Sequence, residues 1–126
     1  MTLNDEVIAA IAQVCHEANR AWANAFQTKD AQPCWSDAAP EIRQSSIDGV
    51  KYVLQHPHVT AMDLHDQWMS YKQAQGWKSG PKDLKAKTHP CLVPYEQLTV
   101  KERLKDHVFL GIVKSFIKEL GALNAS

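Results

Sequence analysis

Apolar residues recur every three or four positions near the start of the chain. The stripe extends from about Asp5 to Thr28 and consists of Val7, Ile11, Val14, Ala18, Trp22 and Phe26. Because residues at this spacing share one face of a helix, the stripe predicts a helix over this range whose apolar face packs against the core.

A second helix is predicted from Pro40 onward. Proline is tolerated in the first turn of a helix, where its missing N–H would have no partner anyway. The apolar positions that follow are Ile42, Ile47, Val50 and Leu54. His56-Pro57-His58 should end this helix, because the residue before a proline is pushed out of the helical region.

Thr60 marks the start of a third predicted helix. Threonine is a favoured N-cap, and Asp63, three residues later, gives a weaker form of the capping box. The predicted helix ends at Gly76. Its inner face consists of Leu64, Trp68 and Tyr71.

The segment from Trp77 to Leu98 is the longest irregular stretch. It contains Gly80-Pro81, His89-Pro90 and Pro94, which exclude a long helix and allow only short extended pieces. An ordered loop of this length inside a compact protein is commonly functional.

The last helix has the clearest pattern. Thr99-Val100-Lys101-Glu102 reads as a capping box, and Gly121 is the predicted C-cap. Between them the apolar stripe consists of Leu104, Val108, Ile112, Val113, Phe116, Ile117 and Leu120. The predicted fold class is therefore mainly α: a compact bundle of about four helices with a long proline-rich loop carrying short β segments.

Size and charge limit the function. A chain of 126 residues can bury one hydrophobic core, so we expect one domain over residues 1–126. Its 14 basic and 14 acidic residues balance. Proteins that bind duplex nucleic acid usually carry a basic surplus, so this class of partner is disfavoured.

The sequence shows no membrane or export signal. It has no apolar run long enough to span a bilayer, and its first residues lack the basic and apolar regions of a signal peptide, so we expect a cytoplasmic protein without membrane partners. Cys15, Cys34 and Cys91 are odd in number and widely spaced. They indicate neither a disulfide framework nor a metal site, and no cofactor is expected.

A set of uncommon residues from His65 onward resembles the Ry repeat of ryanodine receptors. The matching residues are His65-Asp66-Gln67-Trp68, Lys72, Gly76-Trp77, Gly80-Pro81, Lys87-Thr88-His89-Pro90-Cys91-Leu92-Val93-Pro94-Tyr95 and Leu98. The resemblance covers about Asp63 to Leu120. The first half is similar to the N-terminal extension of stand-alone Ry proteins of bacteria and their phages, so we divide the domain into a helical extension, 1–60, and an Ry repeat motif, 61–121.

The resemblance implies a mostly helical, Ry-repeat-like unit with short strands in its proline-rich segment. Ry repeats of the receptors are not enzymes. They pair about a pseudo-two-fold axis and can hold adenine nucleotides between aromatic side chains. The resemblance therefore implies a nucleotide ligand and a homodimer, since a two-fold interface needs only one self-complementary patch. In a bacterium, or in the host cytoplasm for a phage protein, such a domain would sense or sequester a signalling molecule.

Trp68 and Trp77 are candidate ligand residues, because an indole face can stack on any nucleobase. The alternative for Trp68 is core packing on the apolar stripe of its helix. Lys72 and Lys87 match the motif and are candidates for phosphate contacts. The alternative for these lysines is a solvated surface.

His89 is either a structural turn residue or a hydrogen-bond donor to a ligand, and His65 is either a pocket wall or an interior histidine. The resemblance adds Tyr95 to the candidates. On the first helix, His16, Asn19 and Arg20 form a polar cluster. Either Arg20 pairs with Glu17 or Asp48, or it binds a phosphate or carboxylate.

Catalytic templates are missing from the sequence. It contains no Gly-x-Ser-x-Gly, Walker loop, His-Glu-x-x-His or Gly-x-Gly-x-x-Gly motif. We therefore expect a non-enzymatic module that binds an adenine-nucleotide or ADP-ribose-like ligand. The alternatives are a structural or protein-interaction module without a small ligand, and a nucleotide hydrolase that uses His89 or His16.

Overall fold

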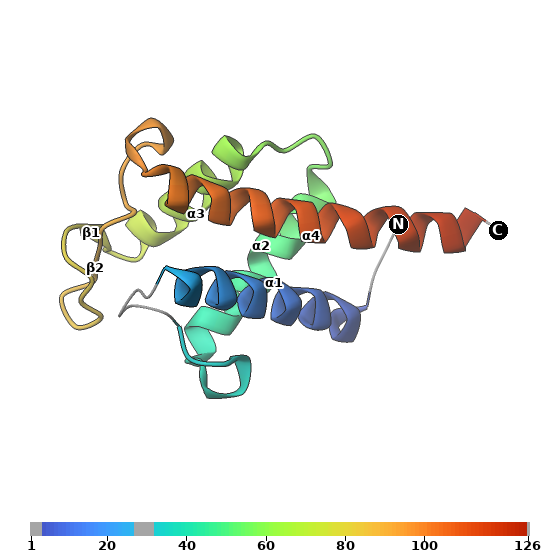
Figure 1. Cartoon of the computed structure of the whole chain (residues 1–126), viewed down its shortest axis with the longest axis horizontal. Coiled ribbons are helices and arrows are strands. Elements are labelled where there is room, and N and C mark those ends of the chain that lie inside the picture. The colour runs from blue at the N-terminus through green and yellow to red at the C-terminus, as the bar shows by residue number, and fades with distance from the viewer. Residues whose placement is uncertain (1–3, 27–31, 126) are drawn as a thin grey trace. The chain divides into compact units, whose positions relative to one another are not determined.

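The computed structural model describes residues 4–26 and 32–125, and Figure 1 shows the order of their elements. The helices are α1 (Asp5–Ala25), α2 (Pro40–Gln55), α3 (Ala61–Ala74) and α4 (Val100–Ala125), with short 3-10 turns η1 (Trp35–Asp37) and η2 (Tyr95–Gln97). The strands are β1 (Lys78–Ser79) and β2 (Thr88–His89). The predicted mainly α fold is confirmed. The predicted helix end at Thr28 lies outside the described residues.

Contacts along the chain define two compact units. The first unit comprises Met1–His58 with Val108–Ser126, and the second unit comprises Val59–His107. The helix α4 contributes its first turns to the second unit and the rest to the first. A single domain over residues 1–126 stays a prediction.

In the first unit, α1 packs against α2 through a different face from the one predicted. The buried residues of α1 are Ile8, Ile11, Ala12, Cys15, His16 and Ala23. Two residues of the predicted stripe are exposed, Val14 at 45% and Phe26 at 49%. The prediction was wrong for these two, because α1 carries apolar residues on more than one face. Advancing the chosen stripe by one residue rotates it about 100° around the helix.

The later turns of α4 complete the core of the first unit. The thiol of Cys15 donates to the carbonyl of Phe109 at 3.9 Å. A Cβ on Gly49 of α2 would lie 3.0 Å from Phe109 Cζ, so this ring packs closely against the backbone of α2. Val50 and Val113 are fully buried.

In the second unit, α3 begins as the sequence predicts. Asp63 N donates to Thr60 Oγ1 at 3.2 Å, and Thr60 N donates to Asp63 Oδ2 at 3.1 Å, which is a complete capping box. The helix ends at Ala74, two residues before the predicted end. Gly76 follows with a φ of +88°, a left-handed conformation that favours glycine.

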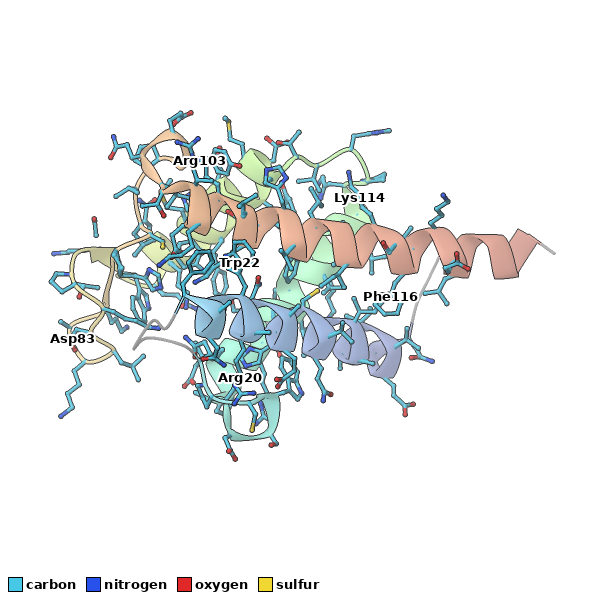
Figure 2. All side chains as sticks on the ribbon, viewed as in Figure 1. Arg20, Trp22, Asp83, Arg103, Lys114 and Phe116 are labelled. Atoms are coloured by element: carbon cyan, nitrogen blue, oxygen red, sulfur yellow. The ribbon has the colours of Figure 1, made fainter. Side chains whose placement is uncertain are left out.

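The predicted short extended pieces are present as β1 and β2. These two strands pair in parallel, with Lys78 opposite Thr88 and Ser79 opposite His89. Between them lies a tight turn in which Asp83 and Thr88 exchange two backbone hydrogen bonds of 3.1 Å. Asp83 is labelled on this turn in Figure 2.

The start of α4 is predicted correctly and its end is not. Thr99 Oγ1 accepts from Glu102 N at 3.2 Å, which is the N-cap half of the predicted box. The helix does not stop at Gly121 but continues to Ala125. A glycine inside a helix costs only about 1 kcal/mol, and Ala122 and Leu123 after it favour helix. Among the described residues, no helix is both long and apolar enough to cross a bilayer.

Candidate functional site

Four ring side chains gather in the second unit, and we call His65, Trp68, His89 and Tyr95 the aromatic cluster. The Trp68 ring lies 5.7 Å from the His65 ring and 5.3 Å from the His89 ring, measured between centroids. The His65 ring is also 6.1 Å from the Tyr95 ring. Trp68 is only partly buried. The cluster therefore holds one indole between two imidazoles, with part of the indole open to solvent.

His65 forms the interior part of the cluster. It is 3% exposed, and its Nε2 lies 2.8 Å from the carbonyl oxygen of Val93. Its Nδ1 lies 3.9 Å from Asp106 Oδ2 on α4. His65 is therefore an interior histidine whose ring lies beside the partly buried Trp68 indole, and its role as a pocket wall stays a prediction.

Asp106 is a site residue that the sequence reading missed. Burial raises the pKa of its carboxyl to about 6, although the nearby His65 lowers it. Glu102, one turn earlier on α4, raises the pKa further, and Lys105 lowers it. The only signal in the sequence was the spacing of Glu102 and Asp106, since carboxylates four residues apart share a helix face.

His89 lies at the end of β2 and has a structural partner. Its Nδ1 accepts from the backbone N–H of Cys91 at 3.0 Å, which closes the turn after Pro90. Burial lowers the pKa of His89 to about 4, and the positive charge of Lys82 lowers it further. His89 is therefore neutral at physiological pH, and its Nε2–H edge remains the donor.

Tyr95 is connected to the start of α4. Its hydroxyl lies 3.2 Å from His107 Nε2, and the guanidinium of Arg103 lies 5.7 Å from the ring centroid. Arg103 donates through Nη2 to Glu96 O at 2.8 Å and through Nε to Leu98 O at 3.2 Å. Figure 2 labels Arg103 on α4. Arg103 and His107 are polar residues beside the cluster that the apolar stripe of the last helix did not indicate.

Lys72 and Trp77 form a separate pair at the end of α3. Lys72 is 8% exposed, and its ammonium lies 4.8 Å from the centroid of the Trp77 ring. Nothing in the residue pattern around Lys72 indicates that this lysine is buried. Lys87 is exposed, adopts a φ of 56°, and donates through Nζ to Gln75 O at 3.1 Å.

Seven of the ten candidates belong to the second unit, and the three on α1 belong to the first unit. His16 Nε2 is 2.7 Å from Pro33 O. Arg20 pairs with Glu17 at 3.3 Å, as one of the two sequence readings expected, and Figure 2 labels Arg20 on α1. Asn19 Oδ1 is buried without a hydrogen-bond partner among the described residues.

Glu17 organises this polar cluster on α1. Its Oε1 accepts from the backbone N–H of Trp35 at 2.8 Å, and the Trp35 ring packs edge-on against His16 at 5.6 Å. The hydrogen bond from Trp35 is the main cause that lowers the pKa of Glu17, with Arg20 adding to it. These contacts attach η1 to α1, so the cluster has a clear structural role.

Comparison with known proteins identifies the family of this chain. The family defined as the RyR domain matches residues 42–125. The chain therefore belongs to the RyR domain family. The match begins inside α2, so it includes part of the segment that the sequence reading assigned to the extension. No curated protein matches the chain.

Proposed function

We propose that this protein is a non-enzymatic binding protein for an adenine-nucleotide or ADP-ribose-like signalling molecule. The partly exposed Trp68 between two imidazole rings is the observation that supports it most. A nucleobase stacked on an aromatic ring gains about 1–3 kcal/mol with little demand on its identity. The neutral His89 can donate one hydrogen bond to the base through Nε2.

The proposed phosphate contacts come from lysines next to the cluster in sequence. Lys72 and Lys87 already have partners, the Trp77 ring and the Gln75 carbonyl. Phosphate binding would require Lys72 to leave the Trp77 ring and Lys87 to leave the Gln75 carbonyl, and a phosphate oxygen accepts a stronger hydrogen bond from an ammonium than a neutral carbonyl does. Arg20 lies in the first unit and remains a separate proposal as a phosphate ligand.

Calorimetry with ATP, ADP-ribose and a cyclic dinucleotide tests the binding proposal. We expect at least one of them to bind, and Trp68→Ala to weaken its affinity about tenfold or more, as loss of stacking predicts. Trp22→Ala is the matched control, because Trp22 packs against Phe26 at 5.0 Å in the first unit. No heat at millimolar ligand overturns the proposal, and an unchanged affinity in Trp68→Ala removes the stacking role.

The same ligands test the proposal that the protein is not an enzyme. We expect ATP and ADP-ribose to remain intact during prolonged incubation with the protein, as followed by chromatography. Turnover that disappears in His89→Ala or His16→Ala would instead establish a nucleotide hydrolase.

A homodimer is part of the proposal, because a single repeat needs a second copy to reproduce the paired arrangement of the receptors. Light scattering should give twice the chain mass at high micromolar concentration. A strict monomer would remove the paired arrangement, leaving the binding proposal to calorimetry. A cytoplasmic location, in a bacterium or in the host of a phage, is proposed with it.

A protein-interaction module is the second candidate, and Leu84 favours it. This side chain is 73% exposed at the tip of the ordered turn between β1 and β2, beside the exposed Lys82 and Lys85. Asp83 Oδ1 accepts from the backbone of Lys85 at 3.0 Å and holds the turn in shape. A partner bound stoichiometrically by the wild type and lost in Leu84→Ser, with no heat from nucleotides, would support it.

A further inference from the structure

The helix α1 carries a second apolar face besides the one that packs in the first unit. The buried face includes Ile8, Cys15 and Ala23. The second face, which we call the open face, lies on another side of the helix and consists of Val7, Ala10, Val14, Ala18, Ala21 and Ala25. Steps of three or four residues connect these positions, so they form one stripe along nearly the whole helix. None of the six is buried, and Val14 is 45% exposed.

An open apolar face of this length indicates a partner. The solvent side of a surface helix normally carries charged and polar residues, whereas a helix that is apolar on both sides is normally covered on both sides. The open face is continuous from Val7 to Ala25 and has a valine near its centre. It also lies outside residues 42–125, which the RyR domain family matches, so membership of the family assigns it no role.

The open face is complementary to itself when two copies of α1 pair in opposite directions. A two-fold axis at Val14 sets each residue opposite the residue equally far on the other side of Val14. Val7 of one copy then lies opposite Ala21 of the other copy, and Ala10 lies opposite Ala18. A large side chain opposite a small one lets the two faces interdigitate, and alanine opposite alanine lets the backbones approach closely. A second copy of this chain therefore fits the open face in shape.

The charges beside the open face fit the same antiparallel pair. Glu6 and Arg20 are nearly four helical turns apart, so they lie on the same side of α1, and in the pair each Glu6 approaches Arg20 of the other copy. The Arg20 side chain is 39% exposed, and its guanidinium, which already binds Glu17, has further donors. A parallel pair would instead gather Asp5 and Glu6 of both copies at one end, where like charges repel and the helix dipoles align unfavourably. Charge complementarity therefore favours the antiparallel pair.

We propose that α1 is the dimerisation helix of this protein, and that its open face pairs antiparallel with the open face of a second copy. This inference rests on the homodimer proposed above and names the surface that forms it. It gives a role to the N-terminal residues that precede the RyR domain match. A single pair of helices is smaller than a standard protein interface, so we expect a dimer that dissociates in the micromolar range.

Sedimentation equilibrium of the full chain tests the open face. Val14→Glu sets two carboxylates against each other at the two-fold axis and should raise the dissociation constant of the dimer about hundredfold or more. Ser70→Glu adds the same charge at an exposed position of α3 and should leave this constant unchanged. Because Val14 is exposed in the single copy, Val14→Glu should keep the helical circular dichroism spectrum of the wild type. An unchanged dissociation constant in Val14→Glu overturns the proposal.

The charge pairs across the dimer have a separate test. Glu6→Arg places a second positive charge beside Arg20 of the other copy, and since the dimer contains two such pairs, its dissociation constant should rise roughly threefold or more. Glu41→Arg is the matched control, because Glu41 is also an exposed glutamate in the first turn of a helix, α2. Equal dissociation constants for the two variants overturn the antiparallel charge pairing.

Disulfide cross-linking tests the register of the pair. With oxidised glutathione, Val14→Cys should form a covalent dimer beyond the background of the wild type, because the two copies of residue 14 face each other across the axis. Ala10→Cys should not, since its two copies are about 12 Å apart along the helices, beyond the reach of a disulfide. A parallel pair would cross-link both variants. Cross-linking of both variants, or of neither, overturns the antiparallel arrangement.

The wild type separates this inference from the proposed homodimer. A wild type that stays monomeric at high micromolar concentration overturns both. A wild-type dimer that persists unchanged in Val14→Glu and Glu6→Arg overturns only the α1 interface, and the homodimer then uses another surface.

Discussion

His89 shows how one residue links the local turn to the stability of the protein. Its Nδ1 accepts from Cys91 N, and this bond requires an unprotonated Nδ1. Burial lowers the pKa of His89 to about 4 from an ordinary value of 6.5. The folded protein therefore resists a proton that the unfolded chain accepts.

We predict that His89→Gln makes the protein less sensitive to acid. Because the pKa of His89 is lower in the folded state, its contribution is fully present above pH 6.5 and is lost as the pH falls through 4. The wild type should lose about 2 kcal/mol more than the variant over this window, allowing for solvent screening. Urea unfolding at several pH values measures the difference. The exposed His58→Gln variant should behave like the wild type.

The sequence indicated several site residues but not their environments. Trp68, His65 and His89 belong to motifs that can be read directly, and the structure brings them together. The approach of Asp106 to His65 depends on tertiary packing between residues about forty positions apart, and the burial of Lys72 likewise depends on the folded structure, neither of which periodicity reports. The polar residues Arg103 and His107 of the last helix were not predicted as site residues, because the apolar stripe of that helix reports only its core-facing positions.

Replacing a glycine by alanine should have opposite effects on the stability of the protein at two positions, one after α3 and one inside α4. Gly76 has a φ of +88°, so Gly76→Ala strains the end of α3 and should destabilise the protein by about 1 kcal/mol. Gly111 lies inside α4, and a Cβ there meets nothing within 4 Å. Gly111→Ala should stabilise by about 1 kcal/mol through helix propensity. Thermal unfolding followed by circular dichroism compares the two, and equal effects would contradict this reading.

The capping box of α3 gives a second prediction for an element. Thr60→Ala removes the acceptor for Asp63 N and should cost about 1 kcal/mol. Ser70→Ala lies on an exposed position of the same helix and should change stability by less than about 0.5 kcal/mol. Chemical denaturation measures the free energy of unfolding of both variants. An unchanged stability in Thr60→Ala would mean that water replaces the cap.

Helix starts were predicted better than helix faces and ends. Pro40, Thr60 and Thr99 start helices through local chemistry, which the sequence contains in full. The face of α1 was misassigned because apolar residues surround much of this helix, and only contact with α2 and Phe109 selects the buried side. Gly121 did not end α4, since a glycine permits a helix end without requiring one.

At the scale of the whole molecule, the loss of stability caused by a substitution on α4 should depend on how deeply the side chain is buried. Val113 is fully buried and Val100 is 67% exposed on the same helix. Val113→Ala leaves a cavity in the core of the first unit and should destabilise by about 2 kcal/mol, whereas Val100→Ala should be nearly neutral. The urea concentration at the midpoint of unfolding measures both losses of stability, provided that the free energy of unfolding depends equally steeply on urea in both variants. Similar losses in the two variants would show that Val113 is not a core residue in solution.

The discontinuous first unit has a consequence for protein synthesis. Cys15 and Gly49 contact Phe109, which the ribosome adds sixty residues after Gly49. While residues 59–107 are being translated, the surface of α1 and α2 that later contacts Phe109 has no α4 to cover it. The N-terminal half therefore cannot complete its core during its own synthesis. A nascent chain stalled before Phe109 should be far more sensitive to protease than one extended past Val113, and its folding depends on holding this apolar surface away from other chains until α4 emerges.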